Sequence, residues 1–255
     1  MTEGTDEFAL EPVKRVAVFE ALLGGTPTRT ELGEQLGVSR ATLHRIVTFL
    51  TEEDLAVETD DGLALTSLGR LVGEEVTGYL DRVTTARELE PLVNAADLSA
   101  LPAEFDLDLF RDARVVLPKP GQPQRPAQRV VELVEGADRV RGLGPVILPV
   151  FVELFHREIL DGMTVEMVIE PDVVEGLEEA YAEQFDAAMA TGNLDVGLHE
   201  SLPFGLVLTA DAVVLIGYDE DDVLRAVVES EDDDLRAWAE TLFETYRESA
   251  TPLED

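Results

Sequence analysis

The sequence has no cysteine among its 255 residues, which excludes a disulfide framework, a thiolate metal site and a cysteine nucleophile. It has only three histidines, and they stand too far apart to predict a metal centre built from several of them. No apolar run approaches the roughly 20 residues that cross a bilayer, and the acidic N-terminus does not resemble a signal peptide. We therefore expect a cytoplasmic protein that has no membrane span, metal or cofactor.

Lysine is also scarce. Lys14 and Lys119 are the only lysines among 19 basic residues, and 54 acidic residues bring the net charge to −35. The acidic residues are spread along the whole chain, so they do not form one disordered acidic tail. In molar salt the Debye length falls to about 3 Å, which screens their mutual repulsion. This composition is similar to that of proteins from halophilic archaea, and we expect such a habitat.

The first part of the chain predicts a helix-turn-helix. Apolar spacing predicts a helix over residues 13–24. Thr28 and Glu31 form a capping-box pattern at the start of a second helix, which ends at Gly37. Ser39 is expected to cap a third helix. Apolar side chains recur at helical spacing along this third helix: Leu43, Ile46, Val47 and Leu50.

The next segment predicts a β-hairpin. Two short apolar runs, residues 55–58 and 63–65, flank a turn with the Asp-Gly hairpin signal, and Thr66 begins a further helix. A helix-turn-helix followed by such a hairpin is typical of a winged helix. Residues 10–75 resemble winged-helix regulators of the MarR and TrmB type, and this resemblance implies a DNA-binding domain over residues 1–75.

The third helix has a local charge unlike that of the whole chain. Residues 37–51 contain arginine and histidine but no acidic residue. Arginines near the start of such a helix reach guanine edges or phosphates in the major groove, and the helix N-terminus favours phosphate. We therefore predict that this surface binds double-stranded DNA. The predicted DNA-binding residues are Thr28, Ser39, Arg40, Thr42, His44, Arg45 and Thr48. The alternative is a winged helix that contacts protein.

A long amphipathic helix is expected over residues 66–89. Its apolar stripe consists of Leu65, Leu68, Val72, Val76, Tyr79 and Val83. Because a two-fold operator requires paired half-sites, we predict a homodimer formed through a helical segment at residues 66–100. The alternative is that this helix packs within its own chain. Pro91 and Pro102 suggest connectors, and the second domain is expected to begin near Leu101 and to span residues 101–255.

Strands and helices alternate in the second domain, which predicts an α/β layer with a largely parallel sheet finished by antiparallel strands. Strands are expected at residues 113–117, 139–148, 164–170, 193–199, 205–209, 212–218 and 223–228. Helices are expected at residues 125–136 and 149–160, over a stripe from Val173 to Met189, and around Leu235 to Tyr246.

Residues 100–250 are similar to the middle or C-terminal domain of methanogenesis (Fil-type) regulators, most clearly at Pro203-Phe204-Gly205, Trp238 and Tyr246. This resemblance implies the phospholipase-D-like layer that sugar-responsive TrmB-type regulators also use. Phospholipase-D chemistry needs a histidine two residues from a lysine, a pair that this sequence lacks, so we expect no catalytic residue. The predicted fold class is α+β: an N-terminal winged helix-turn-helix and a C-terminal, catalytically inactive α/β layer.

A sensor pocket for a small-molecule effector is expected at the strand ends that face the former active centre. The candidate residues are Arg141, His156, Glu170, His199 and Phe204. The sequence also allows structural roles: His156 as a surface residue, Glu170 as a helix cap, His199 as a strand end and Phe204 as core.

The sequence thus predicts a DNA-binding transcriptional regulator and not an enzyme. Two other functions stay open at this point. One is an adaptor that uses the winged helix to contact the transcription machinery. The other is a cryptic hydrolase, against which the missing histidine–lysine pair argues.

Overall fold

The computed structural model describes residues 10–95 and 105–253. The chain divides into two compact units, residues 1–84 and residues 85–255. The acidic N-terminus, Pro102 and the predicted domain start near Leu101 lie outside the described residues. None of the helices in the described ranges combines the length and the apolar composition that a membrane span needs.

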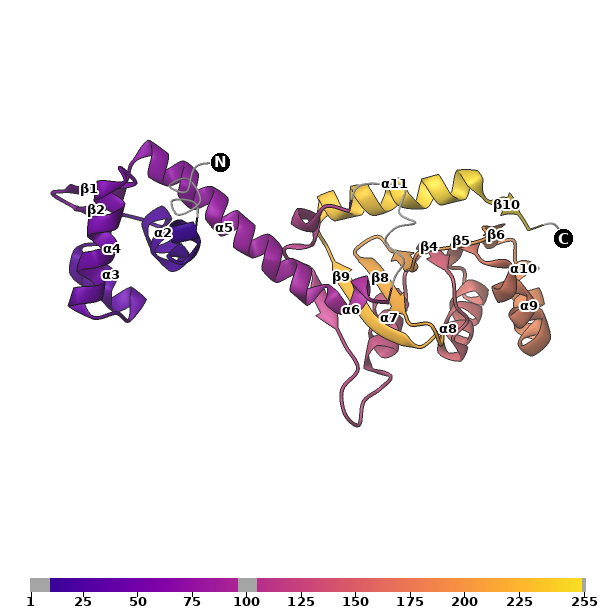
Figure 1. Ribbon diagram of the computed structural model, residues 1–255. Helices are drawn as coiled ribbons and strands as arrows, with labels where there is room; N and C mark the ends of the chain where they lie inside the picture. The colour runs from indigo at the N-terminus through magenta and orange to yellow at the C-terminus, as the bar shows by residue number, and fades with distance from the viewer. Residues whose placement is uncertain (1–9, 96–104, 254–255) are drawn as a thin grey trace. The chain divides into compact units, whose positions relative to one another are not determined.

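The first unit contains helices and a two-stranded hairpin (Figure 1). Its elements are α2 (Val16–Leu23), α3 (Arg29–Leu36), α4 (Arg40–Glu52), β1 (Ala56–Thr59), β2 (Gly62–Leu65) and α5 (Ser67–Glu88), which continues into the second unit. The helices and the hairpin predicted for this part of the chain are confirmed in this order.

The helix starts follow from local sequence. The Thr28 hydroxyl accepts a hydrogen bond from the Glu31 N–H at 3.3 Å, and the Glu31 carboxylate accepts one from the Thr28 N–H at 2.8 Å, so the predicted capping box is confirmed. Gly37 has φ 63°, which lets the chain turn sharply between α3 and α4. Ser39 caps α4 by accepting from the Thr42 N–H at 3.2 Å. These contacts fix the angle at which α4 leaves α3.

Helix α4 buries one apolar face in the first unit's core and leaves its other face exposed. The fully buried core residues of this unit include Phe19, Leu32, Val47, Leu50, Leu55 and Leu63. Gly69 brings the first turn of α5 against β1, because a Cβ there would lie 1.7 Å from the Leu55 carbonyl oxygen. The hairpin packs on α4 through β1, and the first turns of α5 pack on Leu55 and on Phe19 of α2.

The second unit consists of one mixed sheet and the helices on its faces. Its helices are α6 (Glu90–Val93), the 3₁₀ helix η2 (Leu107–Phe110), α7 (Arg125–Val134), α8 (Pro149–Leu160), α9 (Pro171–Ala180), α10 (Ala182–Met189) and α11 (Asp233–Ser249). Its strands are β3 (Arg114–Val116), β4 (Arg139–Gly144), β5 (Thr164–Ile169), β6 (Leu194–Leu198), β7 (Gly205–Leu208), β8 (Val213–Tyr218), β9 (Leu224–Ser230) and β10 (Thr251–Pro252).

The eight described strands follow the order β10-β6-β5-β4-β7-β8-β9-β3. Only β4–β5 and β5–β6 pair in parallel, and every other described pair in this sheet is antiparallel. The prediction of a largely parallel sheet is therefore wrong. The connections between β7, β8 and β9 are too short for a parallel crossover, so these strands form a meander.

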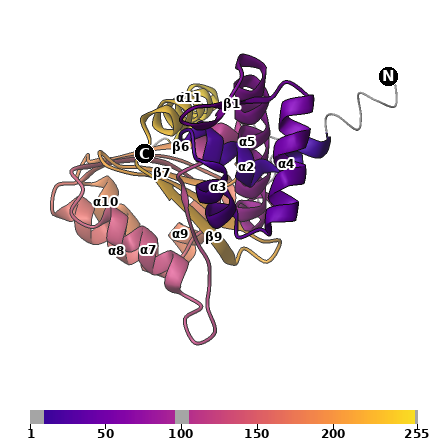
Figure 2. The same cartoon turned by 90° about the vertical axis from the view of Figure 1, so that its left-hand side faces the viewer.

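Both faces of the sheet are covered. In β8, Val213 and Leu215 belong to the core beneath α6 and α11, whereas Val214 and Ile216 belong to the core on the side of α7, α8 and α10. Figure 2 shows α11 on one side of the sheet and α7, α8 and α10 on the other. This arrangement explains why the central strands are apolar without alternation: each residue is buried on one side or the other.

Two predicted boundaries in the second unit are wrong. The apolar stripe from Val173 to Met189 is not one helix, because Tyr181 has φ −137° and separates α9 from α10. The strand predicted over residues 139–148 stops at Gly144, directly before Pro145. Proline has no N–H to donate to a neighbouring strand, which favours the end of β4 at this point.

Candidate functional site

The exposed face of α4 displays the basic side chains that the sequence singled out. Arg40, His44 and Arg45 are exposed, and Thr42 and Thr48 are half-buried. The opposite face of the same helix is buried through Leu43, Val47 and Leu50. The structure thus brings the predicted residues of α4 together on one solvent-facing surface, called here the α4 surface: Ser39, Arg40, Thr42, His44, Arg45 and Thr48.

The two arginines of the α4 surface are not neutralised by the protein. Arg40 and Arg45 form no hydrogen bond or ion pair with any residue that the structure describes. In the same unit, by contrast, Arg29 donates from Nε to the Glu58 carboxylate at 2.6 Å. The sequence between Gly37 and Thr51 contains no acid. The α4 surface therefore keeps its positive charge available to an external anion.

The hydroxyl groups near the start of α4 already have partners. The Ser39 and Thr42 hydroxyl oxygens lie 3.0 Å apart, and Ser39 also caps the helix. Thr28 is exposed at the start of α3, where its hydroxyl donates to the Glu31 carboxylate at 2.8 Å. The hydrogen bond from the Thr28 N–H, and then the one from its hydroxyl, lower the pKa of Glu31, because both favour the charged carboxylate. These hydrogen bonds stabilise the starts of α3 and α4, and Thr28 lies at the start of α3 and not on α4.

The hairpin carries the opposite charge. Glu58, Asp60 and Asp61 are exposed on β1 and at the turn, and Glu58 is paired with Arg29. A phosphate backbone is repelled by such a tip. Asp60 and Asp61 belong to the turn that the sequence predicts, and their adjacent carboxylates are the sequence signal for the negative charge of the hairpin tip. The exposed face of α4 is therefore suited to an anion, and the hairpin tip is not.

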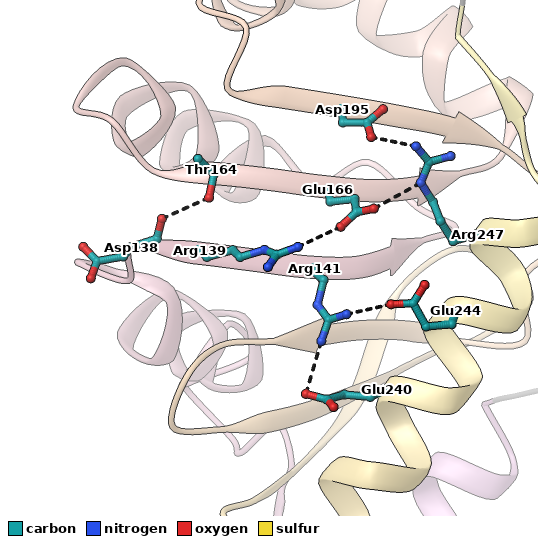
Figure 3. Close-up of polar contacts among 9 residues, drawn as sticks. All are labelled: Asp138, Arg139, Arg141, Thr164, Glu166, Asp195, Glu240, Glu244 and Arg247. Carbon is teal, nitrogen blue, oxygen red and sulfur yellow. Dashed lines mark hydrogen bonds and ion pairs between the residues drawn. The ribbon is translucent and has the colours of Figure 1, made fainter.

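Arg141, a predicted effector residue, is held within a network of ion pairs (Figure 3). It lies on β4, where its guanidinium contacts Glu240 at 3.1 Å and Glu244 at 2.8 Å, both on α11. Its guanidinium carbon also lies 5.4 Å from the centre of the Phe243 ring. Arg247, also on α11, forms a second set of ion pairs by donating to Asp195 at 2.6 Å and to Glu166 at 3.3 Å. The network fastens α11 to strands β4, β5 and β6.

Two other predicted residues meet at the ends of parallel strands. Glu170 directly follows β5 and His199 directly follows β6, and the Glu170 carboxylate accepts a hydrogen bond from the Leu202 N–H at 2.7 Å. Burial raises the pKa of Glu170, while the Leu202 N–H and the nearby His199 act in the opposite direction. His199 packs edge-on against Tyr246 at 4.9 Å between ring centres. Phe204 is 1% exposed and belongs to the core, the role left as its alternative.

His156 lies on the other side of the sheet, on α8. It lines a cavity of about 150 Å³ between the sheet and helices α8, α9 and α10. Gln184 and Tyr218 line the same cavity and were not singled out from the sequence. No sequence signal links these residues, because they come from three separate elements. The five predicted effector residues are therefore not brought into one pocket.

Metal-binding side chains do not gather in groups of three or more within the described ranges. The described residues that line the cavity include no Asp, Glu, Lys or Arg. The arrangements that the fold builds are thus an exposed cationic helix in the first unit and a largely apolar pocket in the second.

Two family models match the chain. Residues 123–249 match the model described as the middle domain of the methanogenesis regulatory protein FilR1. Residues 5–88 match the model described as the HVO_A0261 N-terminal domain. The expected similarity to Fil-type regulators is thereby confirmed, and the FilR1-type domain comprises α7 to α11 with the strands between them. No curated protein matches the chain.

Among solved structures, the chain is similar to the archaeal chromatin protein TrmBL2, which binds DNA. The identity is 14%, the match covers 94% of each chain and the TM-score is 0.45. A phosphatidylserine synthase from Haemophilus influenzae has 14% identity over 83% of this chain and 54% of its own, with a TM-score of 0.43. An O-methyltransferase from Planctomyces limnophilus has 16% identity over 76% of this chain and 58% of its own, with a TM-score of 0.24. At these scores the similarities decide neither fold nor function.

Proposed function

We propose that this chain is a cytoplasmic DNA-binding transcriptional regulator. Residues 1–75 act as a winged helix-turn-helix, residues 66–100 pair two copies, and residues 101–255 sense an effector through a phospholipase-D-like layer that has no catalytic role. The observation that carries the proposal is the unpaired positive charge of Arg40 and Arg45 in a chain with a net charge of −35.

The α4 surface has the chemistry that a major groove requires. An arginine guanidinium group can donate two parallel hydrogen bonds to a guanine edge or to a phosphate. Ser39 and the first N–H groups of α4 lie at the helix N-terminus, where a phosphate is favoured. The buried face of α4 is fixed by the core, so the exposed side chains would enter a groove as one rigid element. The proposed contact residues are Thr28, Ser39, Arg40, Thr42, His44, Arg45 and Thr48.

In molar salt, counterion release contributes little to DNA affinity, because bulk ions are already concentrated. Base contacts and shape complementarity then contribute a larger share of the binding free energy. An acidic hairpin tip is compatible with such binding, because base contacts and shape complementarity do not depend on a general attraction between the protein and phosphate. We therefore expect sequence-specific rather than indiscriminate binding.

Selection of bound duplexes from a random DNA pool tests the proposal, using the full chain in molar KCl. We expect one enriched motif made of two half-sites related by two-fold symmetry, with centres about 34 Å or a multiple of it apart. Recovery of sequences without any common motif would contradict the proposal.

The acidic hairpin favours one alternative function, a protein-contacting adaptor. Glu58, Asp60 and Asp61 would suit a basic partner surface in the transcription machinery. Pull-down of polymerase or basal factors from nuclease-treated extract distinguishes the two functions. Capture that survives nuclease treatment favours the adaptor, whereas capture that depends on DNA favours the regulator.

A further inference from the structure

The cavity in the second unit has an almost entirely apolar wall. It lies between β4–β8 and helices α8, α9 and α10, on the side of the sheet opposite α11 (Figure 2). Its volume is about 150 Å³. Apolar side chains form most of its wall, including Phe151, Phe155, Met167, Phe185 and Leu194. An apolar cavity of about this volume accommodates a benzene molecule.

Small residues leave this space open. Gly144 at the end of β4 and Ala188 on α10 both line the cavity. A Cβ at Gly144 would come within 3.2 Å of side-chain atoms of Met167 and Ile169, so a larger residue there would require these side chains to shift by a few tenths of an ångström. The break at Tyr181 lets α10 pack against α8 instead of continuing the direction of α9. The cavity therefore follows from the local backbone and from residue size.

Three polar side chains interrupt the apolar wall. His156 comes from α8, Gln184 from α10 and Tyr218 from the end of β8. None of them hydrogen-bonds to another residue in the part of the chain that the structure describes. Burial raises the pKa of Tyr218, so its hydroxyl is neutral at ordinary pH and able to donate a hydrogen bond. None of their polar atoms is among the fully buried atoms without a partner in the described residues, so these groups face space that solvent reaches and are available to hydrogen-bond with a ligand.

These features limit the chemistry of an occupant. A carboxylate or phosphate would meet no lysine or arginine in the cavity wall, and a sugar would have too few polar partners for its hydroxyl groups. An aromatic ring suits the volume and the apolar wall, and one polar substituent suits the three polar side chains.

We propose that this cavity binds a small neutral aromatic molecule that carries one hydroxyl group. The ring packs among the apolar side chains, and its hydroxyl group hydrogen-bonds with Tyr218, Gln184 or His156. The inference rests on the proposed function in one respect: it names the class of ligand that the proposed sensing domain would bind. The binding itself does not require DNA.

Titration calorimetry of the full chain in molar KCl tests this site with four probes: phenol, benzene, benzoate and glucose. We expect phenol and benzene to bind and benzoate and glucose not to bind. Tyr218→Phe should weaken phenol binding about 2- to 10-fold, the range for one net hydrogen bond, and leave benzene binding unchanged. Tyr79→Phe, at an exposed tyrosine of the first unit, is the matched control and should change neither.

A filled cavity provides a second test. Ala188→Leu adds bulk to the wall and should abolish binding of phenol and benzene, whereas Ala187→Leu, a neighbour on α10 that does not line the cavity, should leave it intact. Should Ala188→Leu fail to fold, Val152→Phe on the half-buried side of α8 replaces it. Absence of phenol binding, phenol binding that survives a folded cavity-filling variant, or preference for benzoate or glucose would each overturn the proposal.

DNA affinity measured on the same samples separates the two claims. Phenol binding without DNA binding would refute the regulator and leave the ligand site standing. DNA binding without phenol binding would refute the ligand site and leave the regulator standing.

Discussion

Arg40 and Arg45 differ from most arginines of this chain in what surrounds them. Arg114 and Arg129, for example, share the carboxylate of Glu229, and Arg247 bridges two acids. At least ten of the 17 arginines form an ion pair with an acidic residue among the described residues. Structural arginines here fasten one element to another, whereas the two on α4 fasten nothing among the described residues.

Glu170 gives a pH-dependent prediction at the residue scale. Burial raises its pKa in the folded chain, so between the ordinary and the raised pKa the folded state holds more protons than the unfolded state. The Glu170 contribution to stability is therefore lost as the pH rises through this window. Glu170→Gln keeps an acceptor for the Leu202 N–H and removes the buried charge. We expect it to raise Tm at neutral pH and to lose this advantage below pH about 4.

Thermal unfolding followed by Trp238 fluorescence at several pH values measures this effect. Glu175→Gln, at an exposed position on α9, the helix that begins directly after Glu170, controls for the removal of one negative charge from a strongly acidic chain. An equal stabilisation by both variants, or one that does not depend on pH, would show that burial of Glu170 has no special cost.

The residues that sequence could identify are those whose chemistry is local. Thr28 with Glu31 and Ser39 with Thr42 interact three positions apart, so their spacing alone predicts the caps. His156, Gln184 and Tyr218 come from three elements far apart in the chain, so the cavity could not be predicted without the sheet order. The tie of Arg141 to α11 is equally nonlocal.

At the scale of elements, α5 has apolar residues on more than one face. Val72 and Val76 turn toward the first unit, where Val76 is buried. Leu71 is 63% exposed and Tyr79 is 51% exposed, and Leu68 and Val83 are also exposed on this helix. The predicted stripe thus divides into a part used within the chain and a part left in solvent. Exposed large apolar side chains gathered on one helix are typical of an interaction surface.

This surface supports a dimer prediction. If α5 pairs with its copy, Leu71→Glu combined with Tyr79→Glu should convert a dimer into a monomer, because charges would be placed in an apolar contact. Sedimentation equilibrium in molar KCl measures the change. Leu160→Glu, at an exposed leucine of α8 in the second unit, is the matched control and should remain dimeric. A monomeric wild-type chain, or a double variant that stays dimeric, would contradict the prediction.

The sheet also illustrates why elements are easier to predict than their arrangement. The strand–helix alternation from β4 to β6 was visible in the sequence, and the two parallel pairs follow from it. The place of β7 was not visible: it follows β6 in the chain but pairs with β4, antiparallel. Gly142 permits this pairing, since a Cβ there would lie 2.1 Å from the Leu206 carbonyl oxygen.

At the scale of the whole molecule, the net charge of −35 dominates the electrostatics. The ion pairs of the network in Figure 3 weaken in salt, but they are few compared with the unpaired acids. Repulsion among those acids acts over about 30 Å at 0.01 M salt and about 3 Å at 1 M. We therefore expect Tm to rise steeply with KCl concentration.

Neutralising surface acids should mimic salt. Glu178→Gln with Glu179→Gln removes two exposed charges from α9 and should raise Tm at low KCl, with little effect in molar KCl. Thermal scans of wild type and variant over a KCl series, followed by Trp238 fluorescence, measure both effects. A Tm that falls with KCl, or an equal gain at all salt concentrations, would contradict the role given to charge repulsion.

The most direct test of the central claim is DNA affinity in molar KCl by fluorescence anisotropy, using the duplex selected by the wild-type chain. Arg40→Ala with Arg45→Ala is compared with Arg87→Ala, an exposed arginine of the second unit that also has no partner among the described residues. Each arginine that contacts a base contributes about 1–3 kcal/mol, so the double variant should bind at least roughly tenfold more weakly, while Arg87→Ala binds as the wild type does. Equal affinity of the double variant and the wild type would contradict the claim that α4 binds DNA.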